Sequence, residues 1–418
     1  MMERYREYKD SGVKWLGEIP SHWEVLKSKF LWRETFENSQ SGKEDLLSVS
    51  QYTGVTKSMA DSRSESLEGY KIVHKDELVI NIMLAWLGGL GVSDFEGVVS
   101  PAYCTYKLIR NENPKFLHYL YKTPMYLAEF ARHSTGVVPS RWRMYTDDFG
   151  QVLSLLPPLS EQDAIVRYLD TATSEIDKAI AMQQKMIDLL NERKQIIIQN
   201  AVTKGLDENV EMKESGVEWI GRIPKHWEVN PLRKYLKVCS KRNMPDAQLL
   251  SVTREEGVIV RNIESKEENH NYIPDDLSNY KYVQKGQFVI NKMKSWQGSY
   301  GVSNYDGIVS PAYFVYDLMY YNKEYFSLAI RSKKFSPFFS KYSKGIRIDQ
   351  WDLMPEALKI IPFLEPPVEE QNAIVHFLED IIPRINDNIT NCQRQITLLQ
   401  ERKQIIINEV VTGKVRVS

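Results

Sequence analysis

Cysteine is scarce in this 418-residue sequence, which has three, Cys104, Cys239 and Cys392, far apart in the chain. This number and spacing exclude a disulfide framework and a zinc site with paired cysteines. Long apolar runs are also missing. The longest, roughly residues 78–92, is interrupted by Asn81 and by glycines, so it predicts buried sheet and not a membrane span. The first residues lack the apolar core of a signal peptide, and we expect a protein of the reducing cytoplasm.

Recognisable catalytic motifs are missing as well. The Gly-Lys pairs at 42–43 and 413–414 lack the rest of a phosphate-binding loop, and the glycine-rich segment 88–93 does not match the dinucleotide-binding pattern. The seven histidines show no metal-ligand spacing. We therefore expect a chain with no catalytic residue, metal or cofactor of its own. The net charge of −1 implies that any charge for binding DNA must be local.

The sequence does contain a duplication that runs through its whole length. The segment YKDSGVKWLGEIPSHWEV at 8–25 returns as MKESGVEWIGRIPKHWEV at 212–229, and residues 70–103 return at 280–313 with 19 of 34 positions identical. The sequence ERKQIII occurs at 192–198 and at 401–407. A chain made of two copies of one unit is most simply a device with two sites. We expect Trp15, Trp23, Trp219 and Trp227 to pack and to pin each aromatic segment against the end of a helical tail.

Each copy has three parts: a short aromatic segment, a mixed globular domain and a helical tail. In the globular part, apolar and β-branched residues around turns predict strands at 71–83 and 88–99, and residues 113–132 have helical spacing. The predicted fold class is α+β with two similar mixed domains. The predicted segments are an aromatic segment (1–25), a first globular domain (26–158), a helical spacer (159–205), a second aromatic segment (206–229), a second globular domain (230–367) and a second helical spacer (368–418).

The helical tails carry the clearest periodicity. After the Pro-Pro pairs at 157–158 and 366–367, acidic residues predict a short helix. A second helix is expected to start at the capping-box-like SEID at 174–177 and, in the other copy, at Pro383, which suits a first turn. Apolar residues then recur in steps of four and three for about four heptads and stop before Gly205 or Gly413. The stripe positions are Ile176, Ile180, Gln183, Ile187, Leu190, Lys194, Ile197 and Ala201, and in the second copy Ile385, Ile389, Cys392, Ile396, Leu399, Lys403, Ile406 and Val410.

Such a stripe suits a helix packed on its own domain, or two stripes packed on each other, and we favour the pair. An antiparallel pair is expected, because a parallel one would send the connection back along the coil, roughly 45 Å for ~30 residues. The two domains would then lie at opposite ends of a coiled coil, related by a pseudo-two-fold axis, with segment 8–25 beside the C-terminus in a circular organisation. A symmetric register would place Gln183 opposite Lys403 and Lys194 opposite Cys392.

Positive charge gathers in a few segments that lack acidic residues. Residues 331–347 hold six Lys or Arg side chains among aromatic ones, residues 230–245 hold five, and residues 130–146 hold three. Such clusters can contact phosphates and supply the non-specific part of DNA affinity. For any one cluster, a solvated surface is the alternative.

Two matched loops, STGVVPSRW at 134–142 and SKGIRIDQW at 343–351, share a frame but differ in side chains that reach base edges. A second contrast is expected on a strand face, where Ile82 and Leu84 match Lys292 and Lys294. Either each copy reads a different DNA sequence, or these surfaces are unconstrained. The candidate DNA-binding residues are Ser134, Arg141, Arg143, Lys292, Lys294, Lys333, Lys334, Lys344, Arg347 and Gln350.

These features together resemble the DNA-specificity subunit of type I restriction–modification systems. The resemblance covers essentially the whole chain. It rests on the duplicated SGVxWxGxIPxHWEV segments, on the twin PPxxEQxAIV stretches at 157–166 and 366–375, and on the twin ERKQIII helices.

The resemblance implies two target-recognition domains, each reading one half of a split DNA sequence. The helices would set the spacing and dock two modification subunits, which carry S-adenosylmethionine and methylate adenine. Restriction subunits, which use ATP and magnesium, would join that core. The specificity subunit itself has no catalysis. Recognition residues differ among members, so the resemblance assigns no base contact to this chain.

Two other functions remain open at this point. A stand-alone regulator with duplicated DNA-binding domains would bind DNA tightly without partners. A scaffold that grips another protein would show no salt-dependent affinity for DNA.

Overall fold

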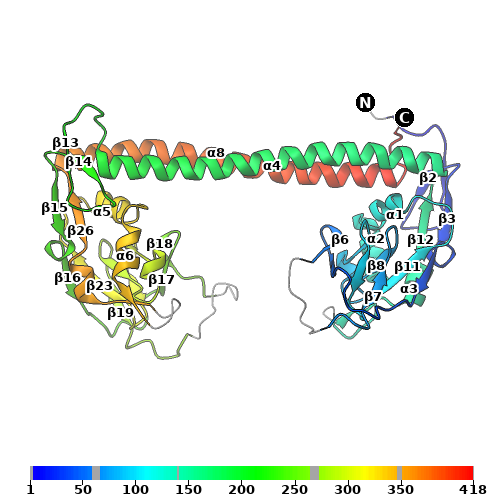
Figure 1. The fold of residues 1–418 in the computed structure, drawn as a ribbon, viewed down its shortest axis with the longest axis horizontal. Coiled ribbons are helices and arrows are strands. Elements are labelled where there is room, and N and C mark those ends of the chain that lie inside the picture. Colours follow the sequence, from blue (N-terminus) through cyan, green and yellow to red (C-terminus); the bar gives the residue numbers. More distant parts are fainter. Residues whose placement is uncertain (1–2, 59–65, 139–140, 264–272, 346–350, 418) are drawn as a thin grey trace. The chain divides into compact units, whose positions relative to one another are not determined.

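The computed structural model describes residues 3–58, 66–138, 141–263, 273–345 and 351–417, and its residues form two compact units. Unit 1 comprises Met1–Gln184 and Gln393–Ser418, and unit 2 comprises Lys185–Cys392. Each unit contains one mixed domain and part of each of two long helices, α4 (Leu159–Lys204) and α8 (Val368–Val411) (Figure 1). Among the described residues, we find no helix long and apolar enough to cross a membrane.

The domain of unit 1 is built around a four-stranded antiparallel sheet of order β4-β11-β8-β9. The two-stranded ladders β1-β2, β3-β12, β5-β6 and β7-β10 complete it. Its elements are β1 (Tyr8–Asp10), β2 (Glu18–Pro20), β3 (Glu24–Lys27), η1 (Ser28–Phe30), β4 (Trp32–Thr35), β5 (Leu47–Ser50), β6 (Gly54–Lys57), β7 (Lys71–Val73), β8 (Leu78–Ile80), η2 (Ala85–Leu87), β9 (Leu90–Val92), β10 (Gly97–Val99), β11 (Cys104–Leu108), α1 (Pro114–Tyr121), α2 (Pro124–Arg132), α3 (Thr146–Gln151) and β12 (Leu153–Leu156).

The domain of unit 2 repeats this plan around the sheet β16-β23-β20-β21, so the duplicated sequence forms a duplicated fold. Its elements are β13 (Met212–Glu214), β14 (Arg222–Pro224), β15 (Glu228–Pro231), η4 (Leu232–Lys234), β16 (Leu236–Cys239), β17 (Leu250–Thr253), β18 (Gly257–Val260), β19 (Lys281–Val283), β20 (Phe288–Ile290), η5 (Ser295–Gln297), β21 (Tyr300–Val302), β22 (Gly307–Val309), β23 (Phe314–Leu318), α5 (Lys323–Ile330), α6 (Ser336–Tyr342), β24 (Ser343–Lys344), β25 (Asp352–Leu353), α7 (Pro355–Lys359) and β26 (Pro362–Glu365). The predicted α+β class with two similar mixed domains is confirmed.

Residues 113–132, predicted to be helical, form two helices and not one. Asn113 caps α1, because its side chain accepts hydrogen bonds from the backbone N–H groups of Lys115 and Phe116. Pro124 is the first residue of α2 and has no N–H to continue the preceding helix. The helical prediction is therefore correct apart from this break.

Two tryptophans pin the aromatic segments to the starts of the long helices. Trp23 and Trp227 are fully buried. Trp23 Nε1 donates to Glu161 Oε1 of α4 at 3.2 Å, and Trp227 Nε1 donates to Glu370 Oε2 of α8 at 2.8 Å. In each unit the preceding histidine bonds to the same carboxylate. The twin HW and EQ motifs therefore meet in space, and the predicted pinning is confirmed.

The other two predicted tryptophans pack on helices of their own domains. The Trp15 ring lies edge-on to Tyr126 of α2, with 5.2 Å between ring centroids. The Trp219 ring lies 4.8 Å from that of Phe338 in α6, and Lys341 Nζ lies 4.5 Å from the Trp219 centroid. The packing role predicted for these residues is confirmed too.

Within unit 1 the two long helices pack antiparallel, start against end. Ile165, near the start of α4, shares a core with Val410, near the end of α8. Farther along, Lys403 Nζ bonds to both carboxylate oxygens of Asp177 at 2.7 Å. As the α4 numbers rise, the α8 numbers fall, which is the antiparallel order.

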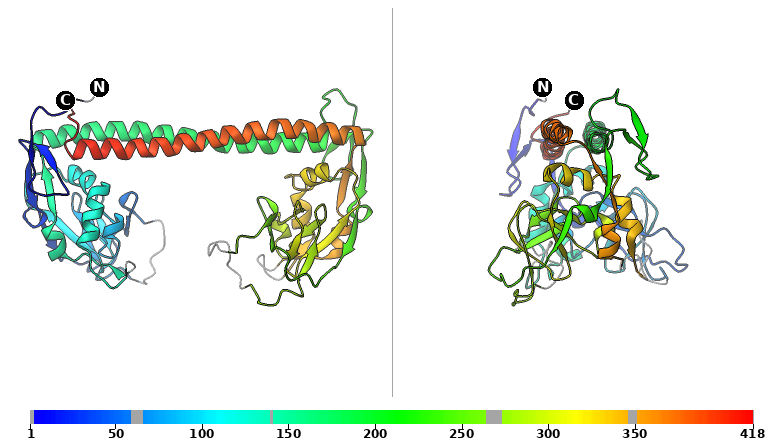
Figure 2. Two further views of the ribbon diagram at one scale, coloured as in Figure 1. Left: turned by 180° about the vertical axis from the view of Figure 1, so that it is seen from behind. Right: turned by 90° about the vertical axis from the view of Figure 1, so that its left-hand side faces the viewer.

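Unit 2 shows the same order at the other halves of the helices. Val202 of α4 shares a core with Val375 of α8, and Lys194 Nζ donates to Asn386 Oδ1 at 3.0 Å. All sixteen predicted stripe positions are buried or half-buried. Figure 2 shows the two helices side by side in both views. The antiparallel pairing through these stripes is confirmed.

The long helices are more continuous than predicted. The helix α4 runs through residues 174–177, where a new start was expected, and α8 runs through Pro383. Pro383 is exposed, so the carbonyl of Glu379, which lacks its usual helical donor, is free to be solvated. Packing on the partner helix continues across both points and outweighs the local stop signals. As predicted, the helices end before Gly205 and Gly413, both with positive φ.

The predicted register of the pair is wrong. Lys403 bonds to Asp177 and not to Gln183, and Lys194 bonds to Asn386 and not to Cys392. Both partners lie six residues from the expected ones, which corresponds to about 9 Å along a helix. The lysines pair with polar groups at the margin of the seam, because the ammonium groups reach out toward water past the apolar seam.

Unit 1 also brings the chain ends together, as the circular organisation predicted (Figure 1). The backbone N–H of Arg416 donates to the Glu3 carbonyl at 2.8 Å. The Tyr8 hydroxyl donates to the Gly413 carbonyl at 3.1 Å. The N-terminal aromatic segment therefore follows the end of α8 in space just as segment 212–229 follows the end of α4 in sequence.

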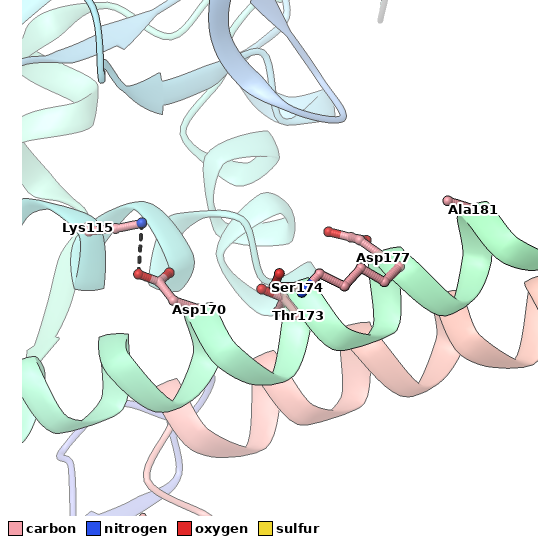
Figure 3. A pocket seen from close by; sticks show the side chains of 7 residues that line it. Lys115, Asp170, Thr173, Ser174, Asp177 and Ala181 are labelled. Atoms are coloured by element: carbon pink, nitrogen blue, oxygen red, sulfur yellow. Dashed lines mark hydrogen bonds and ion pairs between the residues drawn. The ribbon is translucent and has the colours of Figure 1, made fainter.

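The helix α1 ties the domain of unit 1 to α4 through one carboxylate. Lys115 Nζ lies 2.9 Å from Asp170 Oδ2 (Figure 3). The Tyr119 hydroxyl donates to Asp170 Oδ1 at 2.7 Å. Burial and this bond raise the pKa of Tyr119. The corresponding positions of unit 2 hold Glu324 and Glu379, two acids that line the same pocket. The two domains are therefore attached to their helices by different chemistry.

Candidate nucleic-acid interface

In unit 1 the loop after α2 is a narrow hairpin. The backbones of Thr135 and Arg143 exchange two hydrogen bonds of 2.9 Å. A Cβ on Gly136 would lie 2.5 Å from the Arg141 carbonyl oxygen, so this position needs glycine. The backbone N–H of Met144 then donates to the Ile82 carbonyl at 3.0 Å. The hairpin is thereby fixed to the turn that precedes η2.

Unit 2 holds its matching loop in the same way. Ser343 and Lys344 of β24 pair with Leu353 and Asp352 of β25. The backbone N–H of Leu353 donates to the Lys292 carbonyl at 3.0 Å, in the turn that precedes η5. The shared frame predicted for the two loops is therefore present in their described parts.

A tryptophan pair anchors each loop, and this feature was not predicted. Trp86 of η2 packs against Trp142 with ring centroids 5.3 Å apart, and Trp296 of η5 packs against Trp351 at 5.6 Å. The indole N–H of Trp86 donates to the Met83 carbonyl at 3.2 Å, and that of Trp296 makes the matching bond. The signal was in the sequence, because both tryptophans recur at matched positions of the two copies.

The predicted strand-face contrast between the copies is wrong in its geometry. The strand β8 ends at Ile80 and β20 ends at Ile290. Ile82, with Leu84, and the matching lysines therefore lie in turns. Each turn closes on the glycine-containing segment that follows it, as in the bond from Gly89 N to the Leu84 carbonyl at 2.8 Å. The chemical contrast remains, because the turn of unit 1 is apolar where that of unit 2 carries two lysines.

The structure divides the candidate lysines of unit 2 into paired and free-standing groups. Lys292 Nζ lies 2.9 Å from Asp352 Oδ2, and Lys334 Nζ donates to the Trp219 carbonyl at 2.8 Å. These two lysines hold a loop and an aromatic segment in place. Lys294, Lys333 and Lys344 have exposed side chains that can reach a phosphate. Arg347 and Gln350 lie outside the described residues.

The candidates of unit 1 also differ in what they contact. The Ser134 hydroxyl donates to the Phe130 carbonyl at 2.8 Å and thereby satisfies a backbone acceptor at the C-terminal end of α2. Arg143 is half-buried, with its guanidinium 3.3 Å from the Trp142 carbonyl. Arg141 is exposed at the rim of the hairpin. Of the three, Arg141 is best placed to contact a nucleic acid. Whether any candidate contacts DNA stays a prediction.

Among the described residues, no cluster of histidine, cysteine and carboxylate side chains is arranged to hold a metal ion. The described interface consists of loops, cations and aromatic anchors, which is the chemistry of binding.

Comparison with known proteins gives sequence relatives that extend over nearly the whole chain. No family model matches. The chain is 26% identical to the type I restriction enzyme MjaVIII specificity subunit of Methanocaldococcus jannaschii, over 83% of this chain and 82% of the relative. It is 25% identical to the putative type I restriction enzyme MjaX specificity subunit of the same organism, over 98% of each.

The chain is similar to type I restriction enzyme specificity subunits. This similarity confirms the resemblance found in the sequence. A chain from a solved structure of a type I restriction–modification system, described in terms of complex assembly and conformational transition, has the same fold. Its TM-score is 0.65 at 13% identity, and the match covers 94% of this chain and 98% of that one.

Proposed function

We propose that this specificity subunit reads a split DNA sequence, with one half-site for each domain, and joins modification and restriction subunits in one complex. The domain of unit 1 would read one half-site and that of unit 2 the other. The observation that carries this proposal is the pair of matched loops 134–142 and 343–351, which we call the recognition loops. Their described parts share a backbone frame and an anchoring tryptophan pair, but the two sequences carry different side chains.

A common frame with variable side chains is what two readers of different sequences need. Phosphate contacts fix the position of a protein on the duplex, whereas base-edge contacts depend on the identity of a few side chains. Arg141 occupies the position that Gln350 holds in the other copy. Arginine suits guanine and glutamine suits adenine, so this exchange alone would change the base that is preferred.

The long helices offer surfaces for partner subunits. In unit 2, Met186, Leu189 and Ile196 of α4 are about half exposed, and in unit 1 Leu398 and Ile405 of α8 are exposed to a similar degree. Large apolar side chains on a paired helix, pointing away from its seam, suit contact with another protein. We propose that two modification subunits dock here. S-adenosylmethionine would be held by those subunits, and ATP and magnesium by the restriction subunits.

Methylome sequencing tests the proposal directly. Cells that express the chain together with its candidate modification partner are compared with cells that express the partner alone. We expect adenine methylation at one split motif, present only with the chain. Methylation that is unchanged despite an active partner would overturn the proposal in favour of a stand-alone DNA-binding regulator or a scaffold.

Exchanging one domain sharpens this test. Replacing residues 26–156 with the corresponding segment of a homologous chain should change one half of the motif and leave the other half as it was. If both halves changed, the two domains would not be independent readers.

A further inference from the structure

A half-buried lysine holds the tip of a second hairpin in unit 1. Lys122, at the C-terminal end of α1, donates through Nζ to the carbonyl oxygens of Ser50 at 3.3 Å, Gln51 at 3.0 Å and Gly88 at 2.7 Å. All three donors of the ammonium group are thus used. Burial lowers the pKa of Lys122 to about 8, so the group is still protonated at neutral pH. The cation joins the tip of β5-β6 to the end of η2.

Unit 2 holds its tip with an arginine at the corresponding position, but the arginine joins the tip to β21 and not to the end of the short helix. Arg331, at the end of α5, donates to the Tyr300 carbonyl at 2.6 Å and to the carbonyls of Arg254 at 3.1 Å and Glu255 at 2.6 Å. Arg254 and Glu255 form the tip of β17-β18. Although Arg331 belongs to a basic segment of the sequence, its charge is directed at backbone carbonyls of its own domain.

The space beneath the two tips is filled by different side chains. In unit 1 a Cβ on Gly54 would lie 2.8 Å from His118 Cε1. In unit 2 a Cβ on Gly257 would lie 3.0 Å from Arg331 Nη1, and a serine takes the place of the histidine. The same tip position therefore lies against a histidine in unit 1 and against an arginine in unit 2.

Each tip lies against the recognition loop of its domain through the short helix between them. In unit 1 a Cβ on Gly88, the residue that ends η2, would lie 3.1 Å from the Gln51 carbonyl oxygen. Trp86 of the same η2 packs on Trp142 of the recognition loop. In unit 2, η5 makes the same pair of contacts, so tip, short helix and loop form one continuous face in each domain.

The two faces expose different chemistry. In unit 1, Tyr52 at the tip is 83% exposed and Val137 in the loop is 95% exposed, with Leu87 of η2 partly exposed between them. Apolar side chains left so open to water can pack against the methyl groups of thymine. In unit 2, Arg254 and Glu255 at the tip are exposed and can pair with guanine and cytosine edges.

We propose that the hairpin tips 51–53 and 254–256 are part of the DNA-reading face of their domains, and that Lys122 and Arg331 are the residues that position them. This inference rests on the proposed function and adds specificity residues to it. The recognition loops would then share the reading of each half-site with the tips.

The first test changes the exposed tips in the full chain, assembled with its modification subunits. Tyr52→Ala and Arg254→Ala remove exposed side chains at the tips, and the one ion pair that Arg254 makes, 3.7 Å from Nε to Glu255 Oε1, lies within its own tip. Motifs are read by methylome sequencing, and affinities are measured on duplexes with single base-pair changes. In each variant the preference at one or two base pairs of one half-site should fall about five- to 150-fold, which is the range that one good base contact supplies.

Controls of the same residue types separate the outcomes. Tyr321→Ala and Arg33→Ala remove exposed side chains outside the two faces and should leave the motif unchanged. If the native chain yields a split motif but both tip variants keep it in full, the inference is overturned and the proposed function stands. If the native chain yields no motif, the proposed function fails first.

The second test concerns the positioning residues. Lys122→Met removes the cation but keeps the length of the side chain. It should weaken the base preference at one half-site and leave the base preference at the other half-site unchanged. Lys122→Arg should restore the motif, because unit 2 uses arginine at this position. A merely structural role predicts an equal decrease in affinity for every sequence. Such a uniform decrease, with an unchanged order of preference, would overturn the assignment of Lys122.

Discussion

In unit 1 the face formed by tip, short helix and loop shows Tyr52, Leu87 and Val137, whereas the matching segments of unit 2 show Arg254, Lys294 and Lys344. The backbone beneath is the same in both, with the same strand order and an anchoring tryptophan pair. The contrast supports the proposal of two specificities: the buried frame is kept and the exposed side chains change from apolar to charged.

The attachment of each domain to the long helices differs in the same manner. Unit 1 uses the ion pair Lys115–Asp170, and unit 2 has Glu324 and Glu379 in the matching places. Near the starts of α4 and α8, in contrast, the units agree, because a buried tryptophan and a histidine bond to one glutamate in each. The buried contacts at the helix starts are therefore similar in the two copies, whereas the more exposed attachments differ.

The largest effects are expected where the units agree. Trp23→Ala and Trp227→Ala each remove a fully buried indole and its bond to a helix-start glutamate, and each should lower the free energy of unfolding by about 3–5 kcal/mol. Chemical denaturation with tryptophan fluorescence measures this. Substitution by phenylalanine at the same positions keeps most of the volume and should cost less. If the free energy of unfolding fell by less than about 1 kcal/mol in one of the two alanine variants only, the two tryptophans would not be equivalent.

The stability of unit 1 should depend on acid pH more than that of unit 2, because His118 of unit 1 has a serine as its counterpart in unit 2. Burial first, and then Lys122 and Lys115, lower the pKa of His118 to about 4, with Asp94 opposing. The unfolded chain binds the proton below about pH 6.5, and the folded one only near pH 4. The stabilisation is therefore present above pH 6.5 and is lost between pH 6.5 and 4, at most about 3 kcal/mol.

The measurement is the midpoint of denaturation across this pH range. The variant His118→Ser with Lys122→Arg gives unit 1 the arrangement of unit 2 and should be less sensitive to acid. His74 titrates in both proteins, so its opposing effect cancels; its pKa is raised by Glu37 and then Glu96. Equal acid sensitivity of the native chain and this variant would contradict the role given to His118.

Substitutions in the two proposed reading faces should differ in their effect on the salt dependence of DNA affinity. Lys294→Ala with Lys333→Ala removes two exposed cations of unit 2, and the slope of log K against log salt concentration should fall by about 0.9 for each phosphate that is no longer neutralised. The matched change in unit 1, Leu84→Ala, should leave the slope as it is. DNA titrations of the complex at several salt concentrations measure this. A slope that is unchanged in the lysine variant would place the phosphate-binding cations elsewhere.

The smallest effect is expected at the domain attachments. Glu324→Lys gives unit 2 the lysine that unit 1 has at this position, opposite Glu379, and should raise the free energy of unfolding by about 0.2–1 kcal/mol, because exposed ion pairs contribute little. Asp170→Asn in unit 1 should lower it by a similar amount. Thermal denaturation at low and high salt measures both, and the differences should shrink at high salt. A destabilised Glu324→Lys would show that the two attachments are not equivalent in geometry.

Much of this architecture was predictable from the sequence, because it depends on periodicity and repetition. The heptad stripe from Ile176 to Ala201 identifies the buried side of α4 without reference to any partner, since 3.6 residues per turn place those positions on one face. The duplication then supplies the partner helix, and the chain connectivity gives the antiparallel order. The buried Trp23 and Trp227 follow from the same repetition.

Other features depend on tertiary contacts that leave no local pattern. The run of α8 through Pro383 and the offset that brings Lys403 to Asp177 are set by packing between helices, which overrides a local stop signal and shifts the pair from the predicted register. The candidate lysines could not be sorted either, because Lys334 and Lys294 look alike until one is seen bonded to a carbonyl.

What the sequence by itself determined is therefore the repeat, the antiparallel helices and the similarity to specificity subunits. What only the tertiary structure decided is which charges are free to act. Arg331 sits in the most basic segment of the chain, yet it binds backbone carbonyls from the tip of β17-β18, residues 76 and 77 positions away. Side-chain charge is a local property of the sequence, whereas the partner that neutralises it is fixed only when distant segments meet.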